Sequence, residues 1–338
     1  MHAQSVIQLD AVTKRFGSHV AVDNLSLAIP AGTVYGFIGP NGAGKTTTMR
    51  MVVDIIRPDT GTISVFGERD LSRVRHRIGY LPEERGMYKK MRTMEFAVYI
   101  GLLKGMAPAD ARRRVAALMD EYDLGAWKQA TVDALSKGMQ QKMQFIATIV
   151  HEPDLLILDE PFSGLDPVNI ATMTEAVRRS RDSGRTVIFS THMMEHAERL
   201  CDSIFMIHQG RKVLDGALSK IKASMPDRPL RVTCYGDHAF VGRLPYVKRV
   251  REFGNDLEVF LAPGASPQTL LRDIVAQVDV SRFEVAEPSL YDIFLEQVAP
   301  DRGRRFGPDG NLLVAEEAGR AGESLPAGAG PTAKEARR

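Results

Sequence analysis

The stretch that most constrains this 338-residue chain is "GPNGAGKTT", which runs from Gly39 to Thr47. An apolar run (33–38) leads into it and a helix-like segment (46–56) leads out, so the sequence predicts a strand, a tight loop and a helix in succession. Glycines are needed where backbone N–H groups wrap a phosphate, because a side chain would block the approach or because φ must be positive. The stretch therefore predicts a phosphate-binding loop in an α/β fold.

Within this loop the pattern G-x-x-x-x-G-K-[ST] is met by Gly39, Gly44, Lys45 and Thr46. We expect Lys45 to meet the β and γ phosphates of a nucleotide and Thr46 to offer its hydroxyl to Mg²⁺. The positive N-terminal end of the following helix would face the same anion. The other loop residues that we expect to hold the nucleotide are Asn41, Gly42 and Thr47.

A second motif, "LLILDE", supplies an apolar strand (155–158) that ends in Asp159 and Glu160. If this strand ends beside the phosphate loop, Asp159 lies near the Mg²⁺ shell as a metal-side carboxylate. Glu160 then points the other way and could orient or deprotonate an attacking water. An Asp-Glu pair alone would be read as the cap of a strand, but beside the loop we predict a catalytic role for Glu160.

The segments around these motifs alternate between strand-like and helix-like over residues 1–225, and a helical insertion is expected at about 85–150. The apolar runs "VYGFIG", "LLILD" and "TVIFS" are typical of buried parallel strands. Residues 226–298 contain four strand candidates with helix candidates between the first two and the last two, the β-α-β-β-α-β order of a small ferredoxin-like α+β domain. The Gly-, Ala- and Pro-rich residues 299–338 are expected to be a disordered tail.

The overall composition is that of a globular protein. The apolar fraction is 44%, the charged fraction is 25% and the formal net charge is +2, which are values of an ordinary globular protein. Such a charge gives no support to a nucleic-acid partner. The longest apolar run near a helix pattern (97–103) is shorter than the ~20 residues that a membrane span needs. We therefore expect no membrane crossing by this chain alone.

The stretch "LSKGM" (135–139) lies between the phosphate loop and the acidic strand. With those two motifs it makes residues 5–215 resemble the ATP-binding subunit of ABC transporters, which are P-loop NTPases. The family pattern at this place is Leu-Ser-Gly-Gly-Gln, and this sequence departs from it at Lys137 and Met139. The resemblance implies that Ser136 and Gly138 bind the ATP of a second subunit in a head-to-tail dimer, whether homodimer or heterodimer. Ser136 could also simply cap its helix.

Two further family motifs follow the acidic strand. "PFSGLDP" places Asp166 in the loop that the resemblance assigns to the dimer interface and to nucleotide binding. "STHMMEH" places His192 just after the strand "TVIFS", where the family has a catalytic histidine that reaches the γ-phosphate. A lone histidine would more often be structural, but its position in this order favours function. His196 is expected on the surface.

Upstream motifs complete the resemblance. Phe16 stands where the family stacks an aromatic ring on adenine, although a core phenylalanine is the alternative. "RIGYLPEERGMY" covers the loop where the family has a metal-side glutamine, and here Glu83 takes that place. A glutamate oxygen can also ligate Mg²⁺. Glu84 is the competing choice.

The resemblance implies an ATPase motor that binds two ATP and Mg²⁺ in a dimer and drives a separate multi-span membrane permease. It places the docking surface near Glu83 and the helical insertion, around the basic run 85–92, which could instead be a solvated face. The glutamate loop, "LSKGM" and the C-terminal extension resemble a bacterial branch of sodium-extruding and antibiotic-export ATPases. We expect a cytoplasmic location, peripheral on the inner face of the cell membrane.

Two alternatives remain. A soluble ABC-type ATPase acting on ribosomes or DNA usually has two ATPase units or a long coiled-coil insertion, and this sequence has neither. An inactive regulatory subunit is disfavoured by the intact Lys45, Asp159, Glu160 and His192. We therefore favour the transporter motor and expect no nucleic acid as partner.

Overall fold

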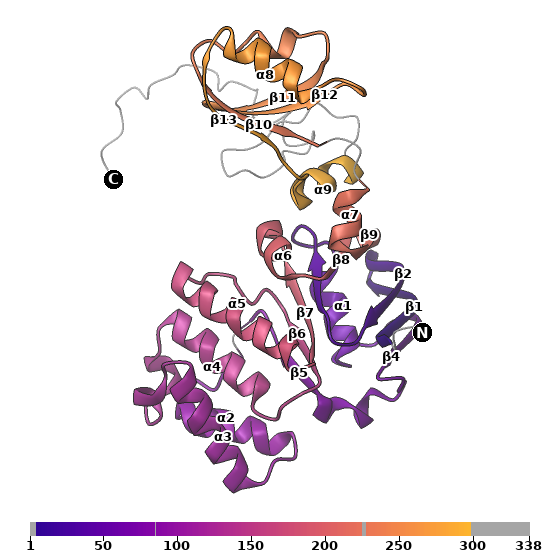
Figure 1. The fold of residues 1–338 in the computed structure, drawn as a ribbon. Coiled ribbons are helices and arrows are strands. Elements are labelled where there is room, and N and C mark those ends of the chain that lie inside the picture. The colour runs from indigo at the N-terminus through magenta and orange to yellow at the C-terminus, as the bar shows by residue number, and fades with distance from the viewer. Residues whose placement is uncertain (1–4, 85, 225–227, 299–338) are drawn as a thin grey trace, which may run out of the picture. The chain divides into compact units, whose positions relative to one another are not determined.

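The computed structural model describes residues 5–84, 86–224 and 228–298 (Figure 1). The predicted disordered tail at 299–338 and the predicted domain boundary at 225/226 lie outside these described residues. A helix long and apolar enough to cross a bilayer does not occur in the described part of the chain.

A six-stranded sheet forms the centre of the N-terminal part. Its order is β5-β6-β7-β3-β8-β9, with the first five strands parallel and β9 antiparallel to β8. The strands are β3 (Val34–Ile38), β5 (Ile78–Leu81), β6 (Leu155–Leu158), β7 (Thr186–Thr191), β8 (Ser203–His208) and β9 (Arg211–Ala217). β3, β6 and β7 are fully buried, as expected for parallel strands covered on both faces. The three apolar runs identified in the sequence are therefore confirmed as central strands.

Different layers cover the two faces of this sheet. On one face, α1 (Lys45–Val52) packs under an antiparallel sheet of β1 (Ser5–Phe16), β2 (His19–Pro30) and β4 (Thr60–Val65). On the other, α5 (Pro167–Asp182) and α6 (Met194–Leu200) contact the central strands. Along β3, Tyr35 and Phe37 enter the first layer, while Gly36 faces Cys201 of the second.

The helix after the phosphate loop is shorter than predicted. The sequence suggested residues 46–56, but α1 ends at Val52, and Asp54 adopts a φ of 59°. A positive φ cannot continue a right-handed helix, and Pro58 follows four residues later. Val53 and Ile56 therefore pack against the core from a loop.

The predicted helical insertion consists of α2 (Thr93–Leu103), α3 (Pro108–Glu121) and α4 (Lys137–Ile149), with α2 packed against both others. Short 3₁₀ turns connect these and the neighbouring elements: η1 (Leu71–Arg73), η2 (Arg75–Arg77), η3 (Gly125–Trp127) and η4 (Val132–Ala134). Met143, Ile146 and Val150 are buried and stand three and four residues apart, so one face of α4 packs into the core. Figure 1 shows the three helices gathered beside α5.

The C-terminal part begins with α7 (Leu218–Ala223) and contains a four-stranded antiparallel sheet. Its elements are β10 (Leu230–Tyr235), η5 (Val241–Arg243), β11 (Val247–Phe253), β12 (Asp256–Leu261), α8 (Pro267–Val275), β13 (Asp279–Val285) and α9 (Leu290–Val298). The sheet order is β11-β12-β10-β13, and the four strands follow one another along the chain as predicted for a ferredoxin-like domain. The helix predicted between the first two strands is wrong. The described residues there hold only η5, because the short connection contains Gly236, Gly242 and Pro245.

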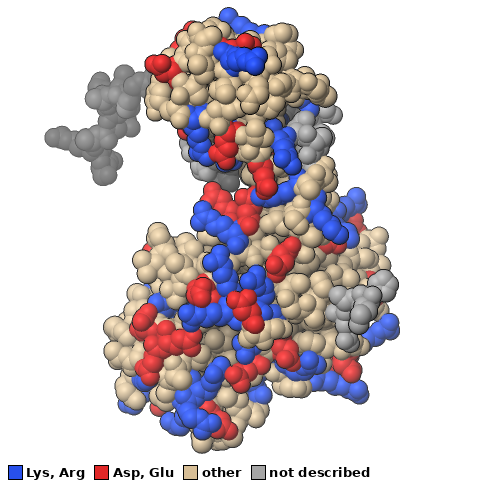
Figure 2. Space-filling view, viewed as in Figure 1, with Lys and Arg blue, Asp and Glu red and all other residues tan. Residues whose placement is uncertain are grey.

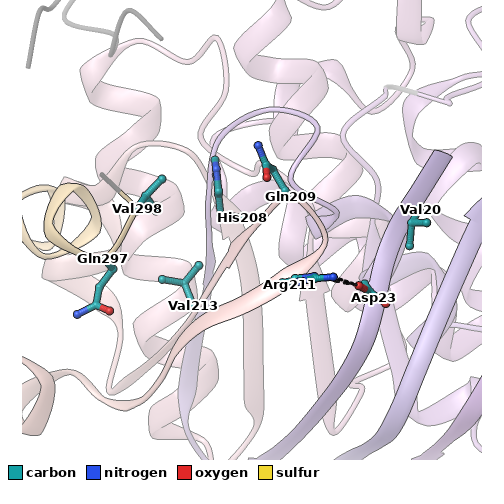
Figure 3. Close-up of a pocket in the computed structure, with 8 residues that line it drawn as sticks. All are labelled: Val20, Asp23, His208, Gln209, Arg211, Val213, Gln297 and Val298. Carbon is teal, nitrogen blue, oxygen red and sulfur yellow. Dashed lines mark hydrogen bonds and ion pairs between the residues drawn. The ribbon is translucent and has the colours of Figure 1, made fainter. Parts of the chain in front are cut away.

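The last helix and the β8–β9 turn border a hollow of about 510 Å³ (Figure 3). Arg211 of β9 pairs with Asp23 of β2 at 2.8 Å across it, which ties the two sheets together. His208 also lines the hollow, and its ring lies edge-on to Phe294 of α9. None of the predicted site residues is among the described residues that line this hollow.

Charges of both signs are interspersed on the face shown in Figure 2. Ion pairs between exposed groups recur in the described residues, for example Arg77 with Asp154 at 2.7 Å and Lys128 with Asp120 at 2.7 Å. This face therefore presents no large field of a single sign.

Candidate functional site

The phosphate loop turns from the end of β3 directly into α1. Gly44 has a φ of 109°, and a Cβ at this position would lie 2.5 Å from the carbonyl oxygen of Ala21. A Cβ on Gly39 would lie 2.2 Å from the carbonyl oxygen of Ile207. Both positions therefore require glycine in this fold, the first for its backbone angle and its neighbour, the second for close packing against β8.

Lys45, the first residue of α1, is 5% exposed. Its Nζ donates to the carbonyl oxygens of Gly39 at 2.7 Å and Pro40 at 3.2 Å, and lies 3.5 Å from Glu160 Oε1. A buried ammonium is unfavourable unless negative groups surround it. The loop thus holds its lysine ready for an anion.

Asp159 follows β6 and is fully buried. Its Oδ1 accepts from Thr46 Oγ1 at 3.0 Å and from Ser190 Oγ at 2.6 Å, while its buried Oδ2 has no partner in the described residues. Burial raises the pKa of Asp159, and the bonds from Ser190 and Thr46 oppose this rise. A free buried carboxylate oxygen beside a threonine hydroxyl fits a hard divalent cation such as Mg²⁺.

Glu160 is buried, with 8% of its surface exposed, and three contacts hold it in place. Its N–H donates to Ser190 Oγ at 2.8 Å, and its Oε2 accepts from His192 Nδ1 at 3.0 Å. The backbone has a φ of 48°, which is uncommon for a glutamate and often marks a functional position. Since a carboxylate can only accept, Nδ1 of His192 carries the proton in this contact. Oε1 of Glu160 has no hydrogen-bond partner among the described residues and faces Lys45.

Lys45, Thr46 and Glu160 border a cleft of about 350 Å³. Asp159 and His192 are not among the described residues that line it, but they bond to Thr46 and Glu160. Its lining combines the phosphate loop with Phe16 and His19 of the β1–β2 hairpin, and with Glu83 from the loop after β5. Phe16 is 51% exposed, so the core alternative is wrong. Glu83 lines the cleft and Glu84 does not. The predicted residues among the lining are Phe16, Asn41, Gly42, Gly44, Lys45, Thr46, Thr47, Glu83 and Glu160.

Four predicted nucleotide residues, Gly39, Ser136, Gly138 and Asp166, are not among the described residues that line this cleft. Gly39 belongs to the phosphate loop itself, and the other three lie at helix starts. Ser136 caps α4 by accepting from Met139 N–H at 3.3 Å, and Asp166 caps α5 by accepting from Asn169 N–H at 2.9 Å. A Cβ on Gly138 would meet the Asn169 amide nitrogen at 2.5 Å, so the two helix starts are neighbours. The two helix starts form a second surface, which we call the cap surface. Its residues Ser136, Gly138 and Asp166 do not line the cleft of their own chain.

Sequence reasoning missed Ser190, His19 and Asn169, and misplaced one histidine. His196 was expected on the surface, but it is half-buried and stacks on Phe162 with ring centroids 4.8 Å apart. The hairpin register could have suggested His19, since it pairs directly with Phe16. No local sequence pattern predicts the hydrogen bonds that Ser190 and Asn169 make.

Comparison with known proteins agrees with this geometry. Residues 22–163 match the family model described as ABC transporter. Residues 216–298 match the model for the C-terminal domain of DrrA1-3-like ATP-binding proteins. A Bacillus subtilis (strain 168) relative, the uncharacterized ABC transporter ATP-binding protein YhaQ, is 39% identical over 293 residues, which are 87% of this chain and 98% of the relative. The chain belongs to the ABC transporter ATP-binding subunits. It is therefore an ABC ATPase, a family that hydrolyses ATP in transport.

Two other similarities bear on this ABC subunit. The Nod factor export ATP-binding protein I of Burkholderia lata is 41% identical over 209 residues, which are 61% of this chain and 69% of that protein. A solved structure, described as an ATP-binding subunit of an ABC transporter, has a TM-score of 0.61 and 29% identity over 65% of this chain and 92% of that one. Members of the family work with membrane permease components and dimerise in general.

Proposed function

We propose that this subunit is the motor of an exporter, and that two copies, or one copy and a similar subunit, close around two Mg·ATP to drive a separate multi-span membrane permease. The observation that carries the proposal is the buried arrangement of Glu160 between His192 and Lys45 at the edge of the cleft. The name of the Nod factor export relative supports the direction of transport.

The cleft would hold ATP from the adenine to the γ-phosphate. The exposed Phe16 ring is free to stack on the adenine, and Lys14 Nζ lies 5.5 Å from its centroid. Asn41, Gly42, Gly44 and Thr47 line the phosphate end. There, Lys45 would exchange its two carbonyl acceptors for phosphate oxygens.

Thr46, Asp159 and Glu83 would hold Mg²⁺. The unpartnered Oδ2 of Asp159 and the cleft-facing position of Glu83 support this assignment. Mg²⁺ held there would neutralise charge on the β and γ phosphates. The raised pKa of Asp159 fits the role, because a bound cation stabilises the ionised form that burial disfavours.

Glu160 would take a proton from the attacking water. At the same time the water oxygen bonds to the γ-phosphorus, and the bond from this phosphorus to the leaving ADP oxygen breaks. His192 donates to Oε2 and so orients the carboxylate with Oε1 toward Lys45. The buried Ser190 fixes the backbone of Glu160 from the other side. The carboxylate is thus held by groups from two neighbouring strand ends.

The cap surface supports a shared site. Ser136 and Gly138 lie at the N-terminal end of the 13-residue α4, where unpaired N–H groups attract anions. Asp166 lies at the neighbouring helix start. Since these residues do not line the cleft of their own chain, we propose that they close over the ATP of the second subunit.

A nucleotide-trapped variant tests the shared site. Glu160→Gln should bind ATP, hydrolyse it slowly and form a dimer in Mg·ATP, as measured by light scattering. The double variant Lys45→Ala/Glu160→Gln is the matched control and should stay monomeric. A Glu160→Gln protein that binds ATP yet remains monomeric would show that the cap surface does not act in trans.

The membrane partner is tested by capture. Tagged Glu160→Gln with Mg·ATP should retain a stoichiometric multi-span protein from detergent-solubilised membranes. Its recovery would also support the peripheral location on the inner face of the membrane. Recovery of ribosomal or DNA-associated proteins instead would favour the soluble ABC-type ATPase and contradict the proposed partnership.

A further inference from the structure

The strand β1 continues past its neighbour β4 before it reaches the cleft. Its last pair with β4 joins Thr13 and Thr60, whereas its pairing with β2 runs on to Phe16. Along this extension the register with β2 shifts between Lys14 and Arg15. A shift of this kind bends a strand and redirects its side chains. The end of β1 is thus an extension that the β4 ladder does not hold.

Asp59, the residue before β4, replaces the missing ladder contacts at this extension. Its backbone N–H donates to the carbonyl oxygen of Thr13 at 2.8 Å. Its Oδ2 accepts from the Arg15 N–H at 2.6 Å, and its Oδ1 accepts from Lys14 Nζ at 2.9 Å. The hydrogen bond from Lys14, and then that from Arg15, lowers the pKa of Asp59, so its carboxylate is ionised at neutral pH. One side chain therefore fixes both the backbone before Phe16 and the lysine.

The lysine is held over the ring of Phe16. Lys14 Nζ lies 5.5 Å from the ring centroid, within the range of a cation–π contact. The Lys14 side chain is 15% exposed, whereas Phe16 is 51% exposed. Phe16 lines the cleft, and Lys14 is not among the described residues that do so. The ammonium therefore backs the ring and leaves the side that faces the cleft open.

This arrangement orders the ring before a ligand arrives. An exposed side chain keeps rotational freedom, and it loses this freedom when a ligand stacks on it. A cation over one face attracts the negative π cloud and so limits the rotation of the ring in the free protein. Lys14 can act in this way because Asp59 has already fixed its long side chain.

We propose that Lys14, held by Asp59, is a positioning residue that backs the Phe16 ring and presents its open face to the adenine of ATP. This rests on the proposed function, in which Phe16 stacks on the adenine. Lys14 acts through the ring, because it does not line the cleft itself. Its charge therefore affects how tightly the base is bound and not the transfer of the phosphate.

The affinity of the purified full chain for Mg·ADP, measured by calorimetry, tests the proposal without hydrolysis. Phe16→Leu should weaken binding about tenfold, because it removes the stacking ring. Lys14→Met keeps the length of the side chain, removes its charge and should weaken binding about threefold. The double variant should bind no more weakly than Phe16→Leu, because Lys14 acts only through that ring. Lys14→Arg keeps a cation and should bind as the wild type does.

Two further variants control for the fold. Lys128→Met removes another lysine from a short ion pair, with Asp120 at 2.7 Å, and should not change the affinity for Mg·ADP. Asp59→Asn removes the charge that holds Lys14 but keeps an oxygen for the Arg15 N–H. It should weaken binding about as much as Lys14→Met, so it tests the same link if Lys14→Met folds poorly.

Steady-state ATP hydrolysis gives a second readout. Lys14→Met should raise KM and leave kcat unchanged, because the contact with the base is the same before and during the chemical step. A lower kcat with an unchanged KM would place Lys14 in the chemical step and contradict the proposal.

The outcomes separate the two proposals. Wild-type affinity in Lys14→Met, or an equal loss from Lys14→Met with and without the Phe16 ring, overturns the role of Lys14 and leaves the stacking of adenine on Phe16 standing. Wild-type affinity in Phe16→Leu overturns the stacking itself, and the role of Lys14 with it.

Discussion

Replacing Ser190 by alanine should damage the site more than any other single hydroxyl removal in the described core. Ser190 is fully buried, donates to Asp159 Oδ1 at 2.6 Å and accepts from Glu160 N–H at 2.8 Å. A hydrogen bond to a charged acceptor is worth about 1.5–3 kcal/mol, and a buried N–H left unpaired costs about 1–3 kcal/mol. Because the alanine removes both at once, we expect the free energy of unfolding to fall by about 3 kcal/mol.

The same change should slow ATP hydrolysis. Glu160 keeps a φ of 48° only while its surroundings hold it, and Ser190 is the partner of its N–H. Loss of that contact lets the carboxylate leave its place between His192 and Lys45. We expect at least about a tenfold lower kcat, which corresponds to about 1.4 kcal/mol.

Ser180→Ala is the matched control. Ser180 is also buried, but its Oγ donates only within its own helix, to the carbonyl oxygen of Ala176 at 2.8 Å. Its loss should cost less than about 1 kcal/mol, because alanine favours the helix. Urea unfolding and steady-state ATPase assays measure both variants. Equal stability losses in the two variants, with wild-type kcat in Ser190→Ala, would refute the positioning role of Ser190.

Three further changes test the cleft and the half-buried His151. Lys45→Ala should abolish nucleotide binding or hydrolysis, and a near-wild-type rate would remove Lys45 from the mechanism. Gly44→Ala should abolish ATP binding in calorimetry, because its Cβ would lie 2.5 Å from the oxygen of Ala21 at a φ of 109°; retained binding would contradict the need for this conformation. The pKa of His151 is lowered to about 4 in the fold, so stability from its neutral form is lost as pH falls from about 6.5 toward 4. Urea unfolding should show wild type losing about 1 kcal/mol more than His151→Phe between pH 7 and 5, after allowance for partial exposure, and equal losses would contradict the shift.

Much of the cleft could be predicted because phosphate chemistry restricts residue types. Lys45, Thr46, Asp159 and Glu160 have side chains that an Mg·ATP site demands, and the structure brings them together. Each of these residues follows a strand of the same sheet, so the order of the motifs along the chain indicated which residues share one site. Glycine at 44 was predictable for the same reason, since the loop geometry excludes a Cβ there.

The residues that sequence reasoning missed act through long-range contacts. Ser190 meets Asp159 across 31 positions and Gln144 meets Pro82 across 62, and both are ordinary polar residues in their local patterns. The helix predicted before β11 does not form, because the connection from β10 is short and contains Gly236, Gly242 and Pro245. Local pattern predicts which elements exist, whereas the partners of a polar side chain follow from the packing of elements far apart in sequence.

The course of α4 shows how one helix serves both the cap surface and the cleft. The helix has 13 residues and is therefore about 20 Å long. Ser136 caps its first turn at the cap surface. Gln144, in its second half, donates to the carbonyl oxygens of Pro82 and Glu84 on either side of Glu83, which lines the cleft. Because an α-helix keeps its backbone bonds when it moves, the same rigid element positions the cap surface and the loop that carries Glu83.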